Sequence, residues 1–113
     1  MTFEACDVVV VPFPFSDRTA EKRRPALVIS NSRFGKDIEH SVMAMITSDR
    51  PESRRWPLDV TLRDLSAAGL SVPSLVRMKL FTIDHRLIVR KAGHLSVADT
   101  RAVRKALTEL LAH

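Results

Sequence analysis

Four consecutive valines at positions 8–11 follow Asp7 and precede prolines at positions 12 and 14. β-branched side chains favour extended backbone, and an unbroken apolar run is typical of a strand covered on both faces. Proline donates no backbone hydrogen bond, so Pro12 and Pro14 end the pairing of this strand. Residues 7–15 therefore predict a strand that is buried on both faces or lies inside a barrel.

Several further short strands are expected along the chain. They are predicted from apolar runs that contain β-branched residues, at residues 25–30, 41–48, 58–62 and 72–83, the last with a break at Pro73. Polar segments separate them: an exposed loop at 16–24, a turn at 31–37 with Gly35 at its tip, a mobile charged loop at 49–57, and a polar turn or helical piece at 63–70.

The last predicted element is an amphipathic helix over residues 97–112. Ser96 and Asp99 have the spacing of a capping box, and four apolar residues fall on one helical face: Val103, Leu107, Leu110 and Leu111. Several short strands without repeated βαβ units, followed by one helix, favour a mainly β fold built on a small antiparallel barrel or curled sheet.

The length and the cysteine content set further limits. A chain of 113 residues with 45% hydrophobic content can bury one modest core, so residues 1–113 are expected to form a single domain. No apolar stretch approaches the roughly 20 residues of a membrane helix, and no basic residue precedes the first apolar run. We therefore expect a cytoplasmic protein without membrane contact, in which the single cysteine, Cys6, is an inert core residue.

The charge of the chain favours a polyanionic partner. The formal net charge is +5, and 13 of the 18 basic residues are arginine. Arginine offers a planar donor that suits bidentate contact with phosphate or carboxylate, so nucleic acid and an acidic protein segment are both reasonable partners. The alternative at this point is a basic domain whose charge serves only solubility.

Motifs for metal, nucleotide and serine-hydrolase chemistry are absent from the sequence. The four histidines show no ligand spacing, one cysteine cannot form a metal cluster, and the three glycines are not clustered into a phosphate-binding loop. No serine nucleophile elbow occurs either. We expect no metal or other cofactor, and we interpret His85 as a structural or surface residue.

The order of four segments resembles a known family. They are DVVVVPFPFSD, KRRPALVIS, MITSD, and the long run GLSVPSLVRMKLFTIDHRLIVRKAGHLS before the closing helix. In this order and spacing they are similar to toxins of the MazF/PemK type from type II toxin–antitoxin systems. The resemblance implies an SH3-like barrel with a C-terminal helix and a homodimer. It also implies metal-independent, sequence-specific cleavage of single-stranded mRNA, and neutralisation by an antitoxin whose extended acidic, apolar segment occupies the substrate groove.

Three residues match the catalytic positions of that family. The resemblance implies that Arg24, which precedes the proline of the family pattern, acts on the scissile phosphate. It also implies that Thr47 is the strand-end threonine and that Arg77 lies near the reacting phosphate. Further residues are expected to bind RNA: Arg18, Arg23, Ser48, Arg55, Trp56 and Lys79. An alternative for Arg77 is a salt bridge to an acid such as Asp84.

Three positions depart from the family pattern. Lys79 stands where characterised members often carry an aspartate, and the first loop lacks the histidine that some members use, so the general acid or base is not identified. Lys79 could be the acid if Arg77 lowers its pKa, or it could hold a flanking phosphate. Cys6 replaces a glycine that usually precedes Asp7, which we interpret as a packing variation.

The chemistry that the resemblance implies requires no metal. The ribose 2′-hydroxyl attacks its own 3′ phosphate, so the protein mainly aligns the chain and stabilises the developing charge with fixed donors. Two other functions stay open on sequence alone. One is a toxin similar to CcdB that binds DNA gyrase without catalysis, and the other is a degenerate family member that binds nucleic acid or its antitoxin without turnover.

Overall fold

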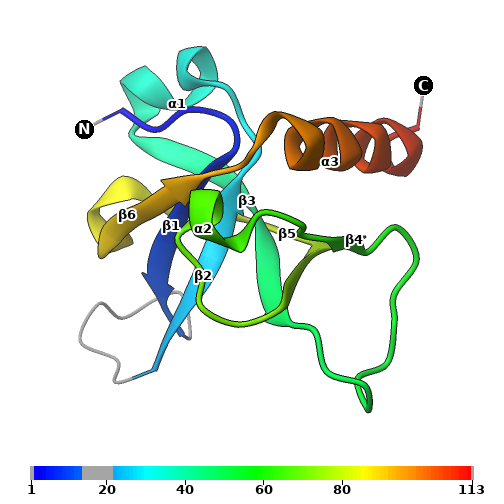
Figure 1. Ribbon diagram of the computed structural model, residues 1–113. Helices are drawn as coiled ribbons and strands as arrows, with labels where there is room; N and C mark the ends of the chain where they lie inside the picture. The colour runs from blue at the N-terminus through cyan, green and yellow to red at the C-terminus, as the bar shows by residue number, and fades with distance from the viewer. Residues whose placement is uncertain (1, 14–21, 113) are drawn as a thin grey trace.

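A computed structural model describes residues 2–13 and 22–112 of the chain. Its elements are β1 (Asp7–Pro12), β2 (Arg23–Val28), α1 (Ser32–Ile38), β3 (His40–Ser48), β4 (Val60–Thr61), α2 (Leu65–Ala68), β5 (Ser74–Asp84), a 3₁₀ turn (His85–Leu87), β6 (Arg90–His94) and α3 (Val97–Leu110). The strands form one antiparallel sheet in the order β4-β5-β3-β2-β1-β6 (Figure 1). The predicted mainly β fold with a C-terminal helix is confirmed.

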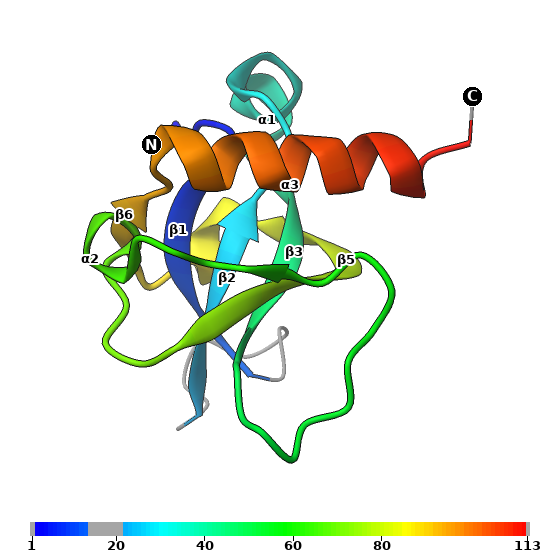
Figure 2. The same ribbon diagram turned by 45° about the vertical axis from the view of Figure 1, so that its right-hand side comes forward.

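The sheet is curled because β5 changes direction half-way along its length. Its second half pairs with the start of β3 as far as Ala44↔Leu80, and its first half pairs with the end of β3 from Met45↔Arg77 onward. The residues between these two registers form a bulge, a feature that bends and twists a strand. Figure 2 shows the bend in β5, with β4 beside its first half and α3 lying across the curled sheet.

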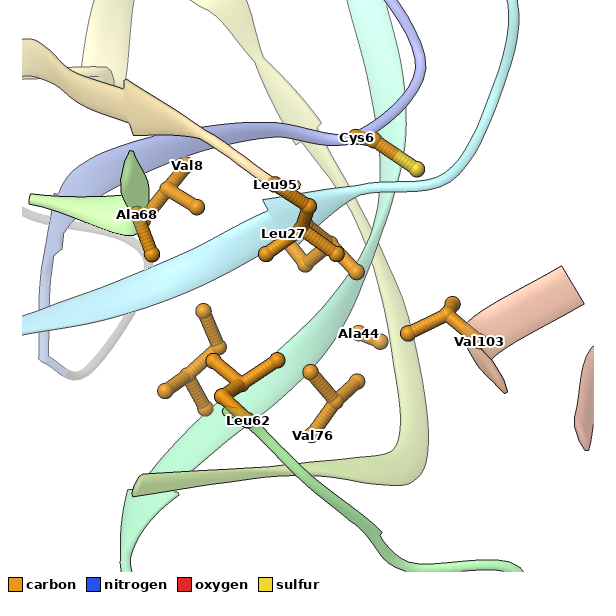
Figure 3. Packing of buried hydrophobic residues seen from close by; sticks show 10 residues of the cluster. Cys6, Val8, Leu27, Ala44, Leu62, Ala68, Val76, Leu95 and Val103 are labelled. Carbon is orange, nitrogen blue, oxygen red and sulfur yellow. The ribbon is translucent and has the colours of Figure 1, made fainter. Parts of the chain in front are cut away.

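Both faces of the sheet are covered, as the valine run predicts. One cluster packs between the sheet and the helices, and Figure 3 shows its members: Cys6, Val8, Leu27, Ala44, Ile46, Leu62, Ala68, Val76, Leu95 and Val103. The other face carries a second buried cluster: Phe3, Val9, Val11, Ala26, Val28, Met43, Ile83 and Ile88. Successive side chains of a strand point to opposite faces, so consecutive valines contribute to both clusters.

Helix α3 forms where the sequence predicts a helix, but its N-terminal contacts differ from the predicted ones. The Ser96 side chain accepts a hydrogen bond from the Asp99 backbone N–H at 3.2 Å, as in a capping box. The Asp99 carboxylate does not return this contact; it is 1% exposed and accepts from the backbone N–H groups of Arg63 and Asp64 at 3.0 Å each. Asp99 therefore ties α3 to the segment after β4. On the predicted apolar face, Val103 is buried while Leu111 is 56% exposed.

Three predicted local features were wrong. Residues 31–37 form most of helix α1 instead of a turn, because the Asn31 side chain caps the helix by accepting from the Phe34 N–H at 2.9 Å. Gly35 is buried within that helix, where a Cβ would collide with the His40 carbonyl oxygen. Strand β2 begins at Arg23 and not at Pro25, because β1 pairs with it as far as Pro12↔Arg23.

The approach of α2 to β6 depends on glycine. Gly69 ends α2 with a φ of +71°, and a side chain there would collide with the Ala92 carbonyl group. Gly93 on β6 would collide in the same way with the backbone of α2. These contacts hold the segment after α2 over the end of the sheet. In the described part of the chain, no helix is long and apolar enough to cross a membrane.

Candidate functional site

A hollow of about 490 Å³ lies where the ends of β2 and β3 meet β6 and the segment after α2. Its lining includes Arg23, Arg24, Thr47 and Ser48, all of which the sequence singles out, together with residues that it does not, among them Ser71 and Arg90. We call this the basic hollow. Four predicted residues from two neighbouring strands therefore lie together, although the arginine pair and the hydroxyl pair are 23 or more positions apart in the sequence.

Arg24 is half-buried and lies over an aromatic ring. Its guanidinium carbon is 4.8 Å from the centre of the Phe13 ring, and the Lys22 ammonium is 5.9 Å from the same ring. Phe13 is half-buried, and it is not a member of either core cluster. Arg24 Nε is buried with no hydrogen-bond partner in the described chain. The Arg24 guanidinium therefore has a cation–π contact with Phe13, and its buried Nε has no acceptor among the described residues.

Thr47 and Ser48 end strand β3 in half-buried positions. They pair with Leu75 and Ser74 of β5, respectively, and Ser74 donates its own hydroxyl proton to the Val72 carbonyl at 2.8 Å. Hydroxyl groups can both donate and accept, so these two side chains suit an anion at the end of the strand.

The strand registers show how Arg77 lies relative to Arg24 and Thr47. Ala26 of β2 pairs with Met45 of β3, and Met45 pairs with Arg77 of β5. Arg24 and Thr47 are each two residues beyond those pairs, and side chains two apart point to the same face of a sheet. Arg24, Thr47 and Arg77 therefore share one face on three adjacent strands, although Arg77 does not line the basic hollow.

The Arg77 guanidinium is held by the loop between β3 and β4. Its Nε and Nη2 groups donate to the two carboxylate oxygens of Asp59 at 3.2 and 3.0 Å, and Nη2 also donates to the Arg54 carbonyl at 3.0 Å. The acid that pairs with Arg77 is thus Asp59; the suggested Asp84 is wrong, since it pairs instead with Arg86 at 2.8 Å. Asp59 is 18 positions away in sequence, and no sequence motif signals the pair.

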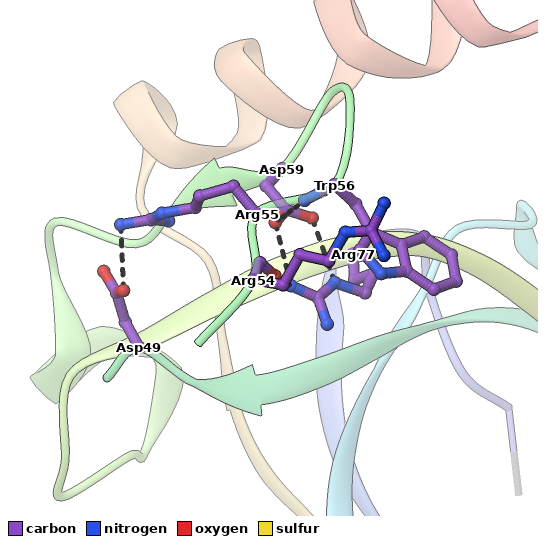
Figure 4. Close-up of polar contacts among 6 residues, drawn as sticks. All are labelled: Asp49, Arg54, Arg55, Trp56, Asp59 and Arg77. Atoms are coloured by element: carbon purple, nitrogen blue, oxygen red, sulfur yellow. Dashed lines mark hydrogen bonds and ion pairs between the residues drawn. The ribbon is translucent and has the colours of Figure 1, made fainter. Parts of the chain in front are cut away.

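Trp56 and two arginines line a second, smaller hollow. The Arg77 guanidinium carbon lies 5.0 Å from the Trp56 ring centre, and Arg55 reaches away to Asp49 at 2.9 Å, as Figure 4 shows. This hollow has a volume of about 310 Å³ and is lined by Arg54, Arg55, Trp56 and Pro57. We call it the loop hollow. Residues 49–57 form a loop without helix or strand, as predicted, while the predicted mobility of this loop stays a prediction.

The other predicted RNA-binding residues lie apart from both hollows or outside the described part. Lys79 is exposed in the β5 bulge, between the two registers of the strand. Arg18 lies outside the described residues. Among described residues, no three His, Cys, Asp or Glu side chains gather in a way that could hold a metal ion.

A buried carboxylate lies between β1 and β6, away from the loop hollow. Asp7 is 2% exposed and accepts from the Glu4 N–H at 2.9 Å, from His94 Nδ1 at 2.8 Å and from Lys91 Nζ at 3.1 Å. Burial alone would raise the pKa of Asp7, but these donors and the Lys91 charge outweigh it, and the pKa lies below the usual value.

His85 packs inside the structure, which confirms its interpretation as a structural residue. Its Nε2 atom is 2.7 Å from the Ser41 hydroxyl, its ring meets Phe3 edge-on at 4.9 Å, and its Nδ1 atom is buried with no partner among the residues described. Burial, followed by the positive N-terminus and His40, lowers its pKa. The folded protein therefore favours the neutral ring.

Comparison with known proteins identifies the family. The sequence model of the PemK-like, MazF-like toxins of type II toxin–antitoxin systems matches residues 4–111. A search of curated protein sequences gave no match.

Solved structures share the fold at low sequence identity. A MazE–MazF complex from Deinococcus radiodurans has a TM-score of 0.72 and 21% identity, covering 97% of this chain and 95% of that one. An endoribonuclease in complex with its cognate antitoxin from a mycobacterial species has a TM-score of 0.73 and 15% identity, covering 95% and 92%. The Mycobacterium tuberculosis toxin MazF-mt6 gives 0.71 and 20%, covering 91% and 93%. With a family match over nearly the whole sequence and the same fold in these structures, the chain belongs to the PemK-like, MazF-like toxins of type II toxin–antitoxin systems.

Proposed function

We propose that this chain is a metal-independent endoribonuclease that cleaves single-stranded mRNA at specific short sequences. The observation that carries the proposal is the shared face of Arg24, Thr47 and Arg77 on three adjacent strands, beside the basic hollow that Arg24 and Thr47 line, in a chain of this toxin family. Convergent donors at fixed positions are what a phosphodiester in a charged transition state requires.

In the proposed reaction, the ribose 2′-oxygen forms a bond to the neighbouring phosphorus and the bond from phosphorus to the 5′-oxygen breaks. The products are a 2′,3′-cyclic phosphate and a 5′-hydroxyl, so the proton lost from the 2′-hydroxyl is balanced by one gained at the leaving oxygen. Arg24 and the Thr47 hydroxyl stabilise the negative charge that grows on the phosphate oxygens. Arg77 has two further N–H groups on Nη1, which we assign to the same phosphate.

The remaining residues hold the strand on either side of the cut. Arg23 and Ser48 line the basic hollow and are assigned to adjacent phosphates. Lys79 is exposed on the bulge of β5, where a mobile ammonium suits a flanking phosphate better than a proton transfer to a buried atom. We further propose a cytoplasmic homodimer whose antitoxin covers the substrate groove with an acidic segment. The similar structures with bound antitoxin support the antitoxin partner, and light scattering tests the dimer.

The test is cleavage of a mixed RNA in EDTA, with the fragment ends sequenced. Arg24→Ala should lower the cleavage rate by about 10²- to 10³-fold, the usual effect of removing one donor to a transition-state oxyanion. Arg101→Ala is the matched control, because Arg101 is exposed on α3 and should leave the rate unchanged.

Three results would contradict parts of this proposal. Equal rates for the wild-type protein and Arg24→Ala would remove Arg24 from the reaction. Inhibition of DNA supercoiling while RNA stays intact would replace the nuclease with a gyrase-binding toxin, and RNA binding with steep salt dependence but no cleavage would identify a non-catalytic member.

A further inference from the structure

The loop between β3 and β4 is fixed by one buried carboxylate that the sequence does not single out. Asp59 has a side chain that is only 4% exposed, and it accepts both Arg77 donors described above. The same Oδ2 atom accepts the Trp56 backbone N–H at 2.9 Å. A single side chain thus joins strand β5 to the residue that carries the indole ring.

Arg77 completes the support of the loop from the other side. Its Nη2 group donates to the Arg54 carbonyl at 3.0 Å, while its guanidinium plane lies against the Trp56 ring (Figure 4). The ring is thereby held on one side by a cation that is itself held by Asp59. Trp56 is nonetheless 41% exposed, so much of this large apolar side chain faces outward.

The backbone here is held in an unfavourable conformation. Leu58 has a φ of +66°, a left-handed conformation that costs energy for a residue with a side chain. A second bond, from the Asp59 N–H to the Trp56 carbonyl at 3.3 Å, closes the same turn. Local strain of this kind persists only where surrounding contacts determine the shape, and Asp59 supplies those contacts.

The loop hollow has the chemistry of a site for one unpaired base. Its volume of about 310 Å³ is enclosed by an indole, a proline ring and two arginines. Proteins that bind single-stranded nucleic acid combine aromatic platforms for the bases with cations for the phosphates. An acidic peptide would satisfy the arginines, but it would leave the outward-facing indole without a flat partner.

We propose that Trp56 stacks on one unpaired base of the RNA and that Asp59 is the positioning residue for this stack. Asp59 acts through Arg77, which it orients beneath the indole, and through the Trp56 N–H. The inference rests on the proposed function only in taking single-stranded RNA as the ligand. It adds a base-binding site beside the phosphate-binding residues of the basic hollow.

Trp56 is the only tryptophan in the chain, so its fluorescence reports on this site alone. The probe is a short RNA with 2′-O-methyl riboses, which lacks the attacking hydroxyl and cannot be cut. Anisotropy of a dye on the oligonucleotide measures binding, and an abasic strand with the same phosphates is the control. We expect the base-containing strand to quench Trp56 fluorescence and the abasic strand to leave it unchanged. Binding without quenching, or equal quenching by both strands, would overturn the stack.

Variants separate positioning from folding. Trp56→Ala should raise the Kd for the uncleavable strand by roughly 5- to 150-fold, the range for loss of one base–aromatic stack, and Trp56→Phe should restore much of the affinity. Asp59→Asn should weaken the contacts that orient Arg77 and the Trp56 backbone. The indole is then less well positioned, so the quenching of its fluorescence by RNA should decrease. The matched control is Asp84→Asn, which breaks a comparable pair with Arg86 elsewhere and should leave quenching intact.

The fluorescence and anisotropy readouts are independent of catalysis. If the wild-type protein fails to cleave RNA yet shows base-dependent quenching, the nuclease proposal fails and the stacking site stands. If cleavage occurs and Trp56→Ala raises KM by at least about fivefold with little change in kcat, both stand. An equal fall in kcat and kcat/KM, or quenching by an acidic peptide but not by RNA, would refute the base-binding role.

Discussion

Cys6 occupies a backbone position that suits glycine. Its φ of +73° lies in the left-handed region, and its N–H donates to the Val28 carbonyl at 2.7 Å. The substitution of cysteine for the family's usual glycine is therefore more than a packing variation, because it adds strain to the start of β1. The thiol is buried within the first cluster, and burial raises its pKa, which is consistent with the inert core residue that the sequence predicts.

This strain predicts an unusual order of stabilities. Cys6→Ala and Cys6→Gly both lose the packing of the thiol, but only glycine relieves the left-handed strain, worth about 1 kcal/mol. We therefore expect Cys6→Gly to be the more stable of the two in urea unfolding. Ala44→Gly, in the middle of β3, should show the ordinary order, with alanine more stable. A more stable alanine variant at position 6 would contradict the strain.

At the scale of elements, Asp99 joins α3 to the segment that follows β4. Asp99→Ala would remove the buried acceptor of the Arg63 and Asp64 N–H groups, at a cost of about 1–3 kcal/mol. We expect a clear loss of unfolding free energy in urea, with the proposed RNA cleavage by the folded protein unaffected. Glu109→Ala, exposed on the same helix, should change stability by less than about 0.5 kcal/mol. A similarly small effect of both substitutions would show that the contact of Asp99 with Arg63 and Asp64 contributes little to stability.

The sequence predicts elements where local patterns are strong. The valine run, the apolar stretch of β5 and the amphipathic pattern of α3 are strong local signals, and all three elements form. Strand β6 was not predicted, because RKAGH contains no run of β-branched residues; it pairs because β1 offers it an edge. The strand order and the bend of β5 depend on contacts between distant residues, which no local pattern encodes.

The residues of the candidate site are likewise of two kinds, those that the sequence predicts and those that only the structure reveals. Arg24 and Thr47 are predicted because they fall in short motifs of fixed order, and the structure brings them into one hollow. Asp59 and Arg90 belong to no such motif, since their proximity to the site arises from pairing across the sheet and around the loop. The roles of all these residues in cleavage stay predictions until the variants are measured.

At the scale of the whole molecule, the free energy of unfolding should decrease as the pH falls below neutrality. His85 and Asp7 both have pKa values in the folded state below their ordinary values of 6.5 and 3.8. The unfolded chain therefore binds more protons than the folded one, and stability falls as the pH falls. The His85 contribution is complete above about pH 6.5 and is lost below it, whereas the Asp7 contribution is lost only in strong acid.

Thermal unfolding from pH 8 to pH 4 tests this. The Tm of the wild-type protein should decrease as the pH falls below about 6.5. His85→Gln, which can still hydrogen-bond to Ser41, should have a flatter profile between pH 5 and 7. The same slope in both proteins would assign the pH dependence to other groups.

The two edge strands of the sheet, β4 and β6, are poorly suited to pairing with a strand of another molecule. β4 is only two residues long, and β6 exposes Arg90, Lys91 and His94 along its length. An edge strand normally invites another chain to extend the sheet, whereas a two-residue strand and exposed arginine and lysine side chains oppose such pairing. The lengths and charges of these two edge strands therefore disfavour growth of the sheet by addition of a further strand.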